Sequence, residues 1–335
     1  MGILINIWRL LLRLPQEVDK YECTTISKMR LKTMFKLKKN LQNATEEILL
    51  ILMFISALLY LRWISSRNNQ DHLLTNRSTD KLNKQIFILA GQSNMAGQGG
   101  VHNFSWDGII PRECQPNPDN ILRLRVNMKW EIAHEPLNYG VDCLHNCGIG
   151  PGMAFANAIL KQDPNFGVIG LVPCSRSGTG IHAWIRGNLP YDQLLTKAKV
   201  ARRDGGTIRG LLWYHGESDS KYKYTARYYK SKFIKFIQDI RTDLNSPLLP
   251  VLVVVLHYPK PPFVGKFVHV VRQAQMDIEL PNVIKVDANG LPVGSDGIHL
   301  TTQAQVQLGN MMAQAFLNAK FQSVTFNSNK TYHMK

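Results

Sequence analysis

The segment Ile86-Phe87-Ile88-Leu89-Ala90-Gly91-Gln92-Ser93-Asn94-Met95-Ala96-Gly97 joins a short apolar run to a polar turn. Residues 86–90 are apolar at every position, which is typical of a strand buried on both faces of a parallel sheet. Gly91 permits a sharp turn after that strand, so Ser93 is expected at the start of a helix or loop. The segment therefore predicts a buried strand with a serine just beyond its carboxyl end.

The same pattern continues along the chain. Further apolar, strand-like runs lie at 168–172, 208–213, 251–256 and 283–286. Helical patterns lie at 153–160, 191–203, 225–244, 268–278 and 302–317. Strands that alternate with helices favour an α/β fold, and we expect one three-layer α/β/α sandwich around a parallel sheet over residues 84–320.

Three predicted loops at the carboxyl ends of strands carry polar side chains, and this edge is where parallel α/β sheets place functional groups. The Ser93 hydroxyl and N–H suit anion binding there, although a helix N-cap explains the serine equally well. Asp296 and His299 are three positions apart, so a carboxylate can orient an imidazole that takes a proton from a serine. The third loop, residues 213–219, favours acid–base chemistry or substrate positioning.

These segments, together with Trp130-Glu131-Ile132 and Gly150-Pro151-Gly152, resemble the blocks of SGNH-type carbohydrate esterases related to sialate O-acetylesterase. The resemblance is strongest to the plant members of carbohydrate esterase family six and spans about residues 84–319. It implies a flavodoxin-like sheet and a serine esterase that uses no metal and no cofactor. It further implies removal of O-acetyl groups from cell-wall polysaccharide or related sugar esters through an acyl-enzyme.

The resemblance also implies residue roles. Ser93 corresponds to the nucleophile, His299 to the general base and Asp296 to the residue that orients His299. The expected oxyanion donors are Ser93, Gly178 and His215. The residues expected to bind substrate are Gln92, Asn94, Glu217 and Trp184.

Two positions depart from the family pattern. His215 stands where relatives usually have Gln, so a neutral ring is expected to donate there with a possible dependence on pH. Ser177 replaces a glycine, and Arg176 adds a cation beside it. These departures leave a second hypothesis open, a catalytically weak or inactive carbohydrate-binding relative.

The N-terminal residues predict a membrane anchor. Residues 1–47 are basic, and the apolar run 48–64 is at the short limit for a membrane-spanning helix. The preceding lysines predict a cytosolic N-terminus, hence a single-pass type II protein whose esterase domain is lumenal or extracellular in the Golgi or secretory pathway. A cleaved signal and a secreted protein are the alternative. Residues 65–83 are expected to form a linker, and 321–335 a polar tail.

Charge and cysteine content are less selective. Hydrophobic residues at 44% and charged residues at 19% exclude a disordered or fibrous chain, while 40 Lys and Arg against 24 Asp and Glu give a net charge of +16. The basic, tyrosine-containing stretch 197–241 has apolar residues at helical spacing, so we expect a solvated helix face and no nucleic-acid partner; an acidic polysaccharide is the next choice. One or two disulfides could form among Cys114, Cys143, Cys147 and Cys174, and the sequence does not determine which cysteines pair.

Overall fold

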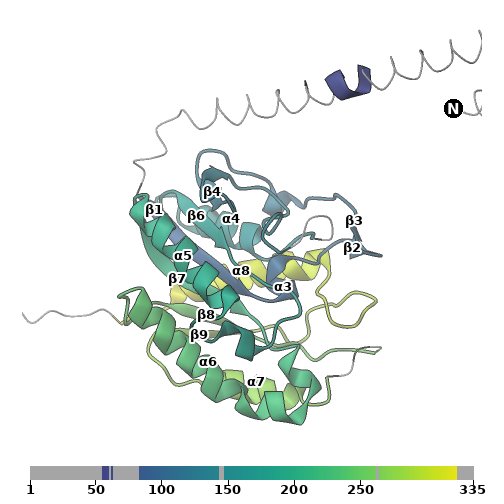
Figure 1. The fold of residues 1–335 in the computed structure, drawn as a ribbon, viewed down its shortest axis with the longest axis vertical. Coiled ribbons are helices and arrows are strands. Elements are labelled where there is room, and N and C mark those ends of the chain that lie inside the picture. Colours follow the sequence, from purple (N-terminus) through teal and green to yellow (C-terminus); the bar gives the residue numbers. More distant parts are fainter. Residues whose placement is uncertain are drawn as a thin grey trace, which may run out of the picture. The chain divides into compact units, whose positions relative to one another are not determined.

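A mostly parallel sheet forms the centre of the unit that spans residues 73–335 in the computed structural model (Figure 1). Within the described residues the sheet has seven strands in the order β5-β4-β6-β1-β7-β8-β9. Neighbouring strands are parallel except for β4 and β5, which pair antiparallel. The strands are β1 Lys84–Gly91, β4 Ile121–Leu124, β5 Trp130–Ile132, β6 Ile169–Pro173, β7 Gly206–Tyr214, β8 Val251–Val255 and β9 Val283–Asp287.

The structure describes residues 55–59, 62, 83–142, 147–261, 263 and 265–322. In the other unit, residues 1–72, the described positions 55–59 and 62 are helical and exposed. No helix among the described residues is both long and apolar enough to cross a membrane. The predicted segment 1–47, most of the span 48–64, nearly all of the linker 65–83 and most of the tail 321–335 lie outside the described residues.

Each main helix follows a strand of the sheet along the chain. They are α4 Gly152–Gln162, α5 Leu189–Arg203, α6 Lys223–Asp243, α7 Val268–Met276 and α8 Thr302–Asn318. Shorter elements are α3 Ser93–Ala96, the 3-10 turns η2 Arg112–Cys114, η3 Ile181–Trp184 and η4 Asp219–Lys221, and the hairpin strands β2 Val101–His102 and β3 Ser105–Trp106.

Two aromatic clusters show which helices cover which face of the sheet. Phe87 of β1 packs edge-on against Phe155 of α4 and Phe316 of α8. Phe87 pairs with Gly210 of β7, so Trp213, three residues further along, points to the opposite face. Trp213 packs against Phe233 and Phe236 of α6, and Tyr191 of α5 also contacts Phe236. Therefore α4 and α8 cover one face, and α5 and α6 cover the other.

The five strands and five helices expected from periodicity are confirmed to within a few residues. The expected parallel sheet is confirmed for six of its strands, and the exception is β5, which pairs antiparallel with β4 at one edge. Both strands are short, and Arg123 interrupts the apolar run of β4, which hides the pattern. The apolar face of α6 is buried as expected, with Phe233, Phe236, Ile237 and Ile240 inside the core.

The cysteine question is answered in part. Cys114 and Cys174 are free, buried thiols. Cys147 is disulfide-bonded, and Cys143 lies outside the described residues.

Candidate active site

Ser93 lies at the point where the connectivity of the sheet changes direction. Strand β1 has β6 on one side and β7 on the other, an arrangement that opens a crevice at the carboxyl ends of these strands. Gly91 leaves the sheet with φ +131, and a Cβ there would lie 2.1 Å from the Tyr214 carbonyl oxygen. The backbone of β7 therefore requires glycine at this turn, which delivers Ser93 to the first position of α3.

Ser93, His299 and Asp296 form a hydrogen-bonded chain. His299 Nε2 is 2.8 Å from Ser93 Oγ, and His299 Nδ1 is 2.6 Å from Asp296 Oδ2. Ser93 is 8% exposed, while the His299 side chain is 26% exposed. The arrangement lets Nδ1–H donate to Asp296, so that Nε2 is free to accept the serine proton.

Asp296 is held as a carboxylate. Partial burial opposes its ionisation, but hydrogen bonds from the N–H groups of His299 and Ile298 and from the imidazole outweigh burial and hold the pKa of Asp296 below its usual range. Its Oδ1 accepts those two N–H groups at 3.0 and 2.9 Å, so Oδ2 is directed at the imidazole. The carboxylate therefore orients His299 and stabilises the imidazolium that forms when Ser93 loses its proton.

Asn94 joins the serine loop to the histidine loop. Its side-chain amide donates to Glu217 Oε1 at 2.8 Å and to the Ile298 carbonyl at 3.2 Å, and its oxygen accepts the Leu300 N–H at 3.0 Å. Ile298 and Leu300 flank His299 in sequence. Asn94 is fully buried, and its bonds on both sides of His299 fix the position of the base.

Gln92 and Glu217 belong to the same buried layer. Gln92 Oε1 accepts the N–H groups of Gly216 and Ser218, both at 3.4 Å. Burial raises the pKa of Glu217, against the hydrogen bond from Asn94. Gln92 is 2% and Glu217 3% exposed. These hydrogen bonds indicate that Gln92, Asn94 and Glu217 hold the catalytic loops together, and their binding of substrate stays a prediction.

His215 and Trp184 lie in the interior of the fold, and their expected roles stay predictions. Trp184 is fully buried and packs edge-on against Trp213, so its ring offers no face to a sugar. His215 is fully buried between Trp213 and Tyr229, with Nδ1 3.8 Å from Asp219 Oδ2. A ring without surface for a water molecule has none for a substrate oxygen. Burial lowers the pKa of His215 to about 3, so the ring is neutral and carries no pH response near neutrality.

The turn that follows β6 carries Gly178. The Arg176 N–H donates to the Gly91 carbonyl at 2.9 Å, which fastens this turn to the start of the serine loop. Ser177 donates its N–H to Asp142 Oδ2 at 2.8 Å, and Gly178 follows with φ +71, exposed to solvent. The serine at position 177 is thus accommodated, and the left-handed conformation falls on the retained glycine.

His257 is a neighbour of the triad that motif comparison did not single out. It follows β8, and its Nδ1 lies 2.9 Å from the Tyr214 hydroxyl. Burial lowers the pKa of His257 to about 4, and the charges of His299 and Arg272 act in the same direction. Its position just beyond a buried strand was the available signal, because Ser93 and Glu217 follow strands at the same edge.

The polar groups at this edge suit nucleophilic catalysis. Within the described ranges no group of three or more His, Cys, Asp and Glu side chains could hold a metal ion. A serine hydroxyl bonded to an oriented imidazole can attack an acyl carbon once the imidazole takes its proton.

Comparison with known proteins agrees with this geometry. The family model described as carbohydrate esterase, sialic acid-specific acetylesterase, matches residues 83–318. A probable carbohydrate esterase of Arabidopsis thaliana is 47% identical over 241 residues, which cover 70% of this chain and 90% of that protein. An X-ray structure of an Arabidopsis thaliana protein is 46% identical with a TM-score of 0.67, over 70% of this chain and 98% of that one. The crystal structure of NanS shares the fold, with a TM-score of 0.56 at 16% identity over 71% of this chain and 98% of its own.

Proposed function

This chain belongs to the carbohydrate esterase family of sialic acid-specific acetylesterases, and on that premise we propose that it works through a covalent acetyl-Ser93 intermediate. As a member of this family it is a carboxylic ester hydrolase, which removes O-acetyl groups from carbohydrate. Its proposed substrates are acetylated cell-wall polysaccharides or related sugar esters. The observation that supports this proposal is the hydrogen-bonded chain from Ser93 through His299 to Asp296.

Acylation begins with proton transfer along the 2.8 Å contact. His299 Nε2 takes the hydroxyl proton as Ser93 Oγ forms a bond to the acetyl carbonyl carbon. The tetrahedral intermediate then expels the sugar oxygen, which receives the proton from His299 and leaves as a free hydroxyl. The acetyl group remains on Ser93 as an ester.

The carbonyl oxygen of the acetyl group becomes negatively charged in the tetrahedral intermediate, and hydrogen-bond donors must stabilise it. We assign this role to the N–H of Ser93, because the first N–H groups of a helix have no partner within it, and to the N–H of Gly178. One such donor contributes about 3–4 kcal/mol of transition-state stabilisation in known hydrolases. His215 is left out of this set because it is buried.

Deacylation repeats the chemistry with water. His299 Nε2 takes a proton from a water molecule, whose oxygen attacks the acetyl carbon of acetyl-Ser93. The intermediate releases acetate, and Ser93 Oγ recovers its proton from His299. Asp296 stays ionised through both steps and holds Nδ1–H in place.

The test replaces Ser93 and follows hydrolysis of p-nitrophenyl acetate and acetylated xylan. Ser93→Ala is expected to lower kcat by about 10³-fold or more, since the nucleophile is lost. Ser231→Ala is the matched control, because Ser231 is an exposed serine on α6. Equal hydrolysis by Ser93→Ala and wild type would refute the mechanism, and it would favour the non-catalytic carbohydrate-binding alternative where both rates equal that of buffer alone.

We further propose that residues 48–64 anchor the chain as a type II membrane protein with a lumenal or extracellular esterase domain. The support is the uncharged run Ile48 to Leu61 behind a lysine cluster. The full chain is expected to stay in the membrane pellet after alkaline carbonate extraction. Its release into the supernatant would contradict an anchor, and loss of an N-terminal epitope from a secreted product would indicate cleavage.

A further inference from the structure

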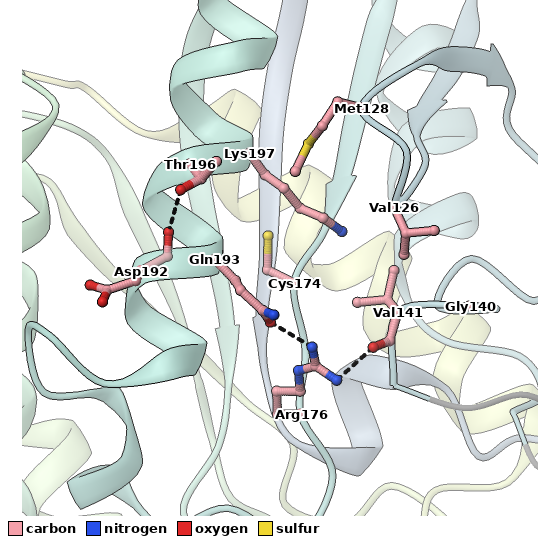
Figure 2. A pocket seen from close by; sticks show the side chains of 10 residues that line it. All are labelled: Val126, Met128, Gly140, Val141, Cys174, Arg176, Asp192, Gln193, Thr196 and Lys197. Carbon is pink, nitrogen blue, oxygen red and sulfur yellow. Dashed lines mark hydrogen bonds between the residues drawn. The ribbon is translucent and has the colours of Figure 1, made fainter.

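A pocket of about 420 Å³ lies beside the turn that carries Gly178 (Figure 2). Cys174 and Arg176 line it, and the Arg176 N–H donates to the carbonyl of Gly91, two residues before Ser93. The pocket and the nucleophile therefore flank the same short segment of chain. A volume of this size falls in the range of small-molecule sites, roughly 300–1,000 Å³.

Lys197 places a buried ammonium group in this pocket. The residue belongs to α5 and is 6% exposed, and Figure 2 shows its side chain crossing toward Val126 and Val141. Its Nζ donates to the Pro173 carbonyl at 2.7 Å. In the described part of the chain no carboxylate forms an ion pair with it. Burial lowers the pKa of Lys197, because the uncharged Pro173 carbonyl does not neutralise the ammonium, and an anion from outside the protein would stabilise the charged form.

Arg176 adds a second cation that is held in position. Its guanidinium donates to the Val141 carbonyl at 2.6 Å and to Gln193 Oε1 at 2.5 Å, and lies 4.0 Å from Asp142. This ion pair with Asp142 offsets part of the Arg176 charge, which leaves Lys197 as the main positive group of the pocket, and the acid that lines the pocket, Asp192, is engaged elsewhere. Asp192 Oδ1 accepts the N–H of Gly187, and Figure 2 shows the Asp192 carboxylate directed away from both cations.

The remaining walls are apolar or neutral. Val126, Met128 and Val141 lie opposite α5 and supply surface against which a sugar ring can pack. Burial raises the pKa of the Cys174 thiol to about 11, so this group stays uncharged near neutral pH. The pocket thus combines a positive pole with room for a ring.

We propose that this pocket binds the carboxylate of an acidic sugar, such as a uronic acid residue, next to the acetylated sugar on which Ser93 acts. The pocket's role in selecting the substrate rests on the proposed esterase function. Binding of the acidic sugar to the pocket does not depend on catalysis. Lys197 Nζ forms the charge-assisted hydrogen bond to the carboxylate, and Arg176 adds to the positive field.

Calorimetric titration of the full chain with D-glucuronate and D-glucose tests the proposal, because these sugars differ in a carboxylate against a CH₂OH. Glucuronate is expected to bind at least about tenfold more tightly than glucose, the size of one charge-assisted hydrogen bond. Lys197→Met is expected to weaken glucuronate binding by about the same factor. Lys199→Met, an exposed lysine on the same helix, is the matched control and should bind as wild type does.

Val126→Glu provides a second variant in case Lys197→Met fails to fold. Val126 is 50% exposed, so a carboxylate there repels glucuronate without altering the core. Equal binding of glucose and glucuronate would overturn the proposal, as would acetate that binds as tightly as glucuronate. Ser93→Ala should keep glucuronate binding while it loses hydrolysis of p-nitrophenyl acetate. Persistent hydrolysis in that variant would refute the esterase mechanism and leave the pocket standing.

Discussion

Replacing Asn94 by Ala is expected to damage catalysis without touching the nucleophile, the base or the acid. The change removes the partners of three groups: Glu217 Oε1, the Ile298 carbonyl and the Leu300 N–H. A buried polar group left without a partner costs about 1–3 kcal/mol, so the free energy of unfolding should fall by roughly 3 kcal/mol or more. Two of these groups flank His299, which frees the base to move.

The catalytic effect follows from the geometry of the base. His299 Nε2 must remain near its 2.8 Å separation from Ser93 Oγ to receive the proton. A misplacement of about 1 Å can lower a rate by about 10²-fold, and we expect kcat to fall by that order. KM for p-nitrophenyl acetate should change by less than about threefold, because Asn94 is fully buried and acts through the position of His299.

The assay pairs urea unfolding with steady-state kinetics at a temperature where circular dichroism shows the variant to be folded. Asn157→Ala is the matched control. Asn157 lies on α4, and its amide donates to two backbone carbonyls, those of Glu113 and Gln115. That variant should lose stability and keep its kcat. A folded Asn94→Ala protein with kcat within about twofold of wild type would refute the positioning role, since a loose base cannot sustain that rate.

Two further substitutions test the electrostatics. Asp296→Asn should lower kcat by about 10²–10⁴-fold with little change in KM, because an amide cannot hold Nδ1–H or stabilise the imidazolium. Asp277→Asn is its control, because Asp277 is an exposed residue directly after α7, and equal losses in both variants would contradict the assignment. Glu135 is buried, which raises its pKa to about 8 from 4.5. The folded state therefore holds more protons than the unfolded chain, and this carboxyl makes stability fall as pH rises from about 4.5 to 8. Glu135→Gln should remove that component. Between pH 5 and pH 8, the free energy of unfolding of the variant relative to wild type, measured by urea titration, should therefore rise by about a few kcal/mol. If the two proteins show the same dependence of unfolding free energy on pH, Glu135 does not titrate as described.

The meeting of Ser93, His299 and Asp296 could be predicted because its signals are local or topological. The apolar strand before Gly91 places Ser93 at the carboxyl edge of the sheet, and the three-residue spacing of Asp296 and His299 sets their mutual contact. The long strands and helices could also be predicted, because the hydrophobic pattern of each element is a local signal. Strands β4 and β5 were not predicted, because both are short and β5 pairs antiparallel with β4 at the edge of the sheet.

The burial of the other motif residues could not be predicted, because it depends on contacts between distant segments. Asn94 meets Ile298 and Leu300 more than 200 residues later, and Gln92 meets Gly216 and Ser218. A sequence motif places these side chains near the nucleophile without saying on which side of the loop they lie. His215 shows the same effect, since its neighbours Trp213 and Tyr229 enclose it from a strand and a helix.

The burial of the motif residues around Ser93 has a consequence for substrate specificity. Gln92, Asn94, Glu217 and His215 are each at most 3% exposed, so their interactions set the shape of the catalytic loops and leave little of their surface for a sugar. Substrate selection must then come from exposed surface around Ser93 that lies outside the motif blocks. The turn after β6 meets that condition, since Arg176 contacts the serine loop through its backbone and a positively charged pocket through its side chain. Relatives with the same buried layer and a different turn should therefore keep the chemistry and choose other sugars.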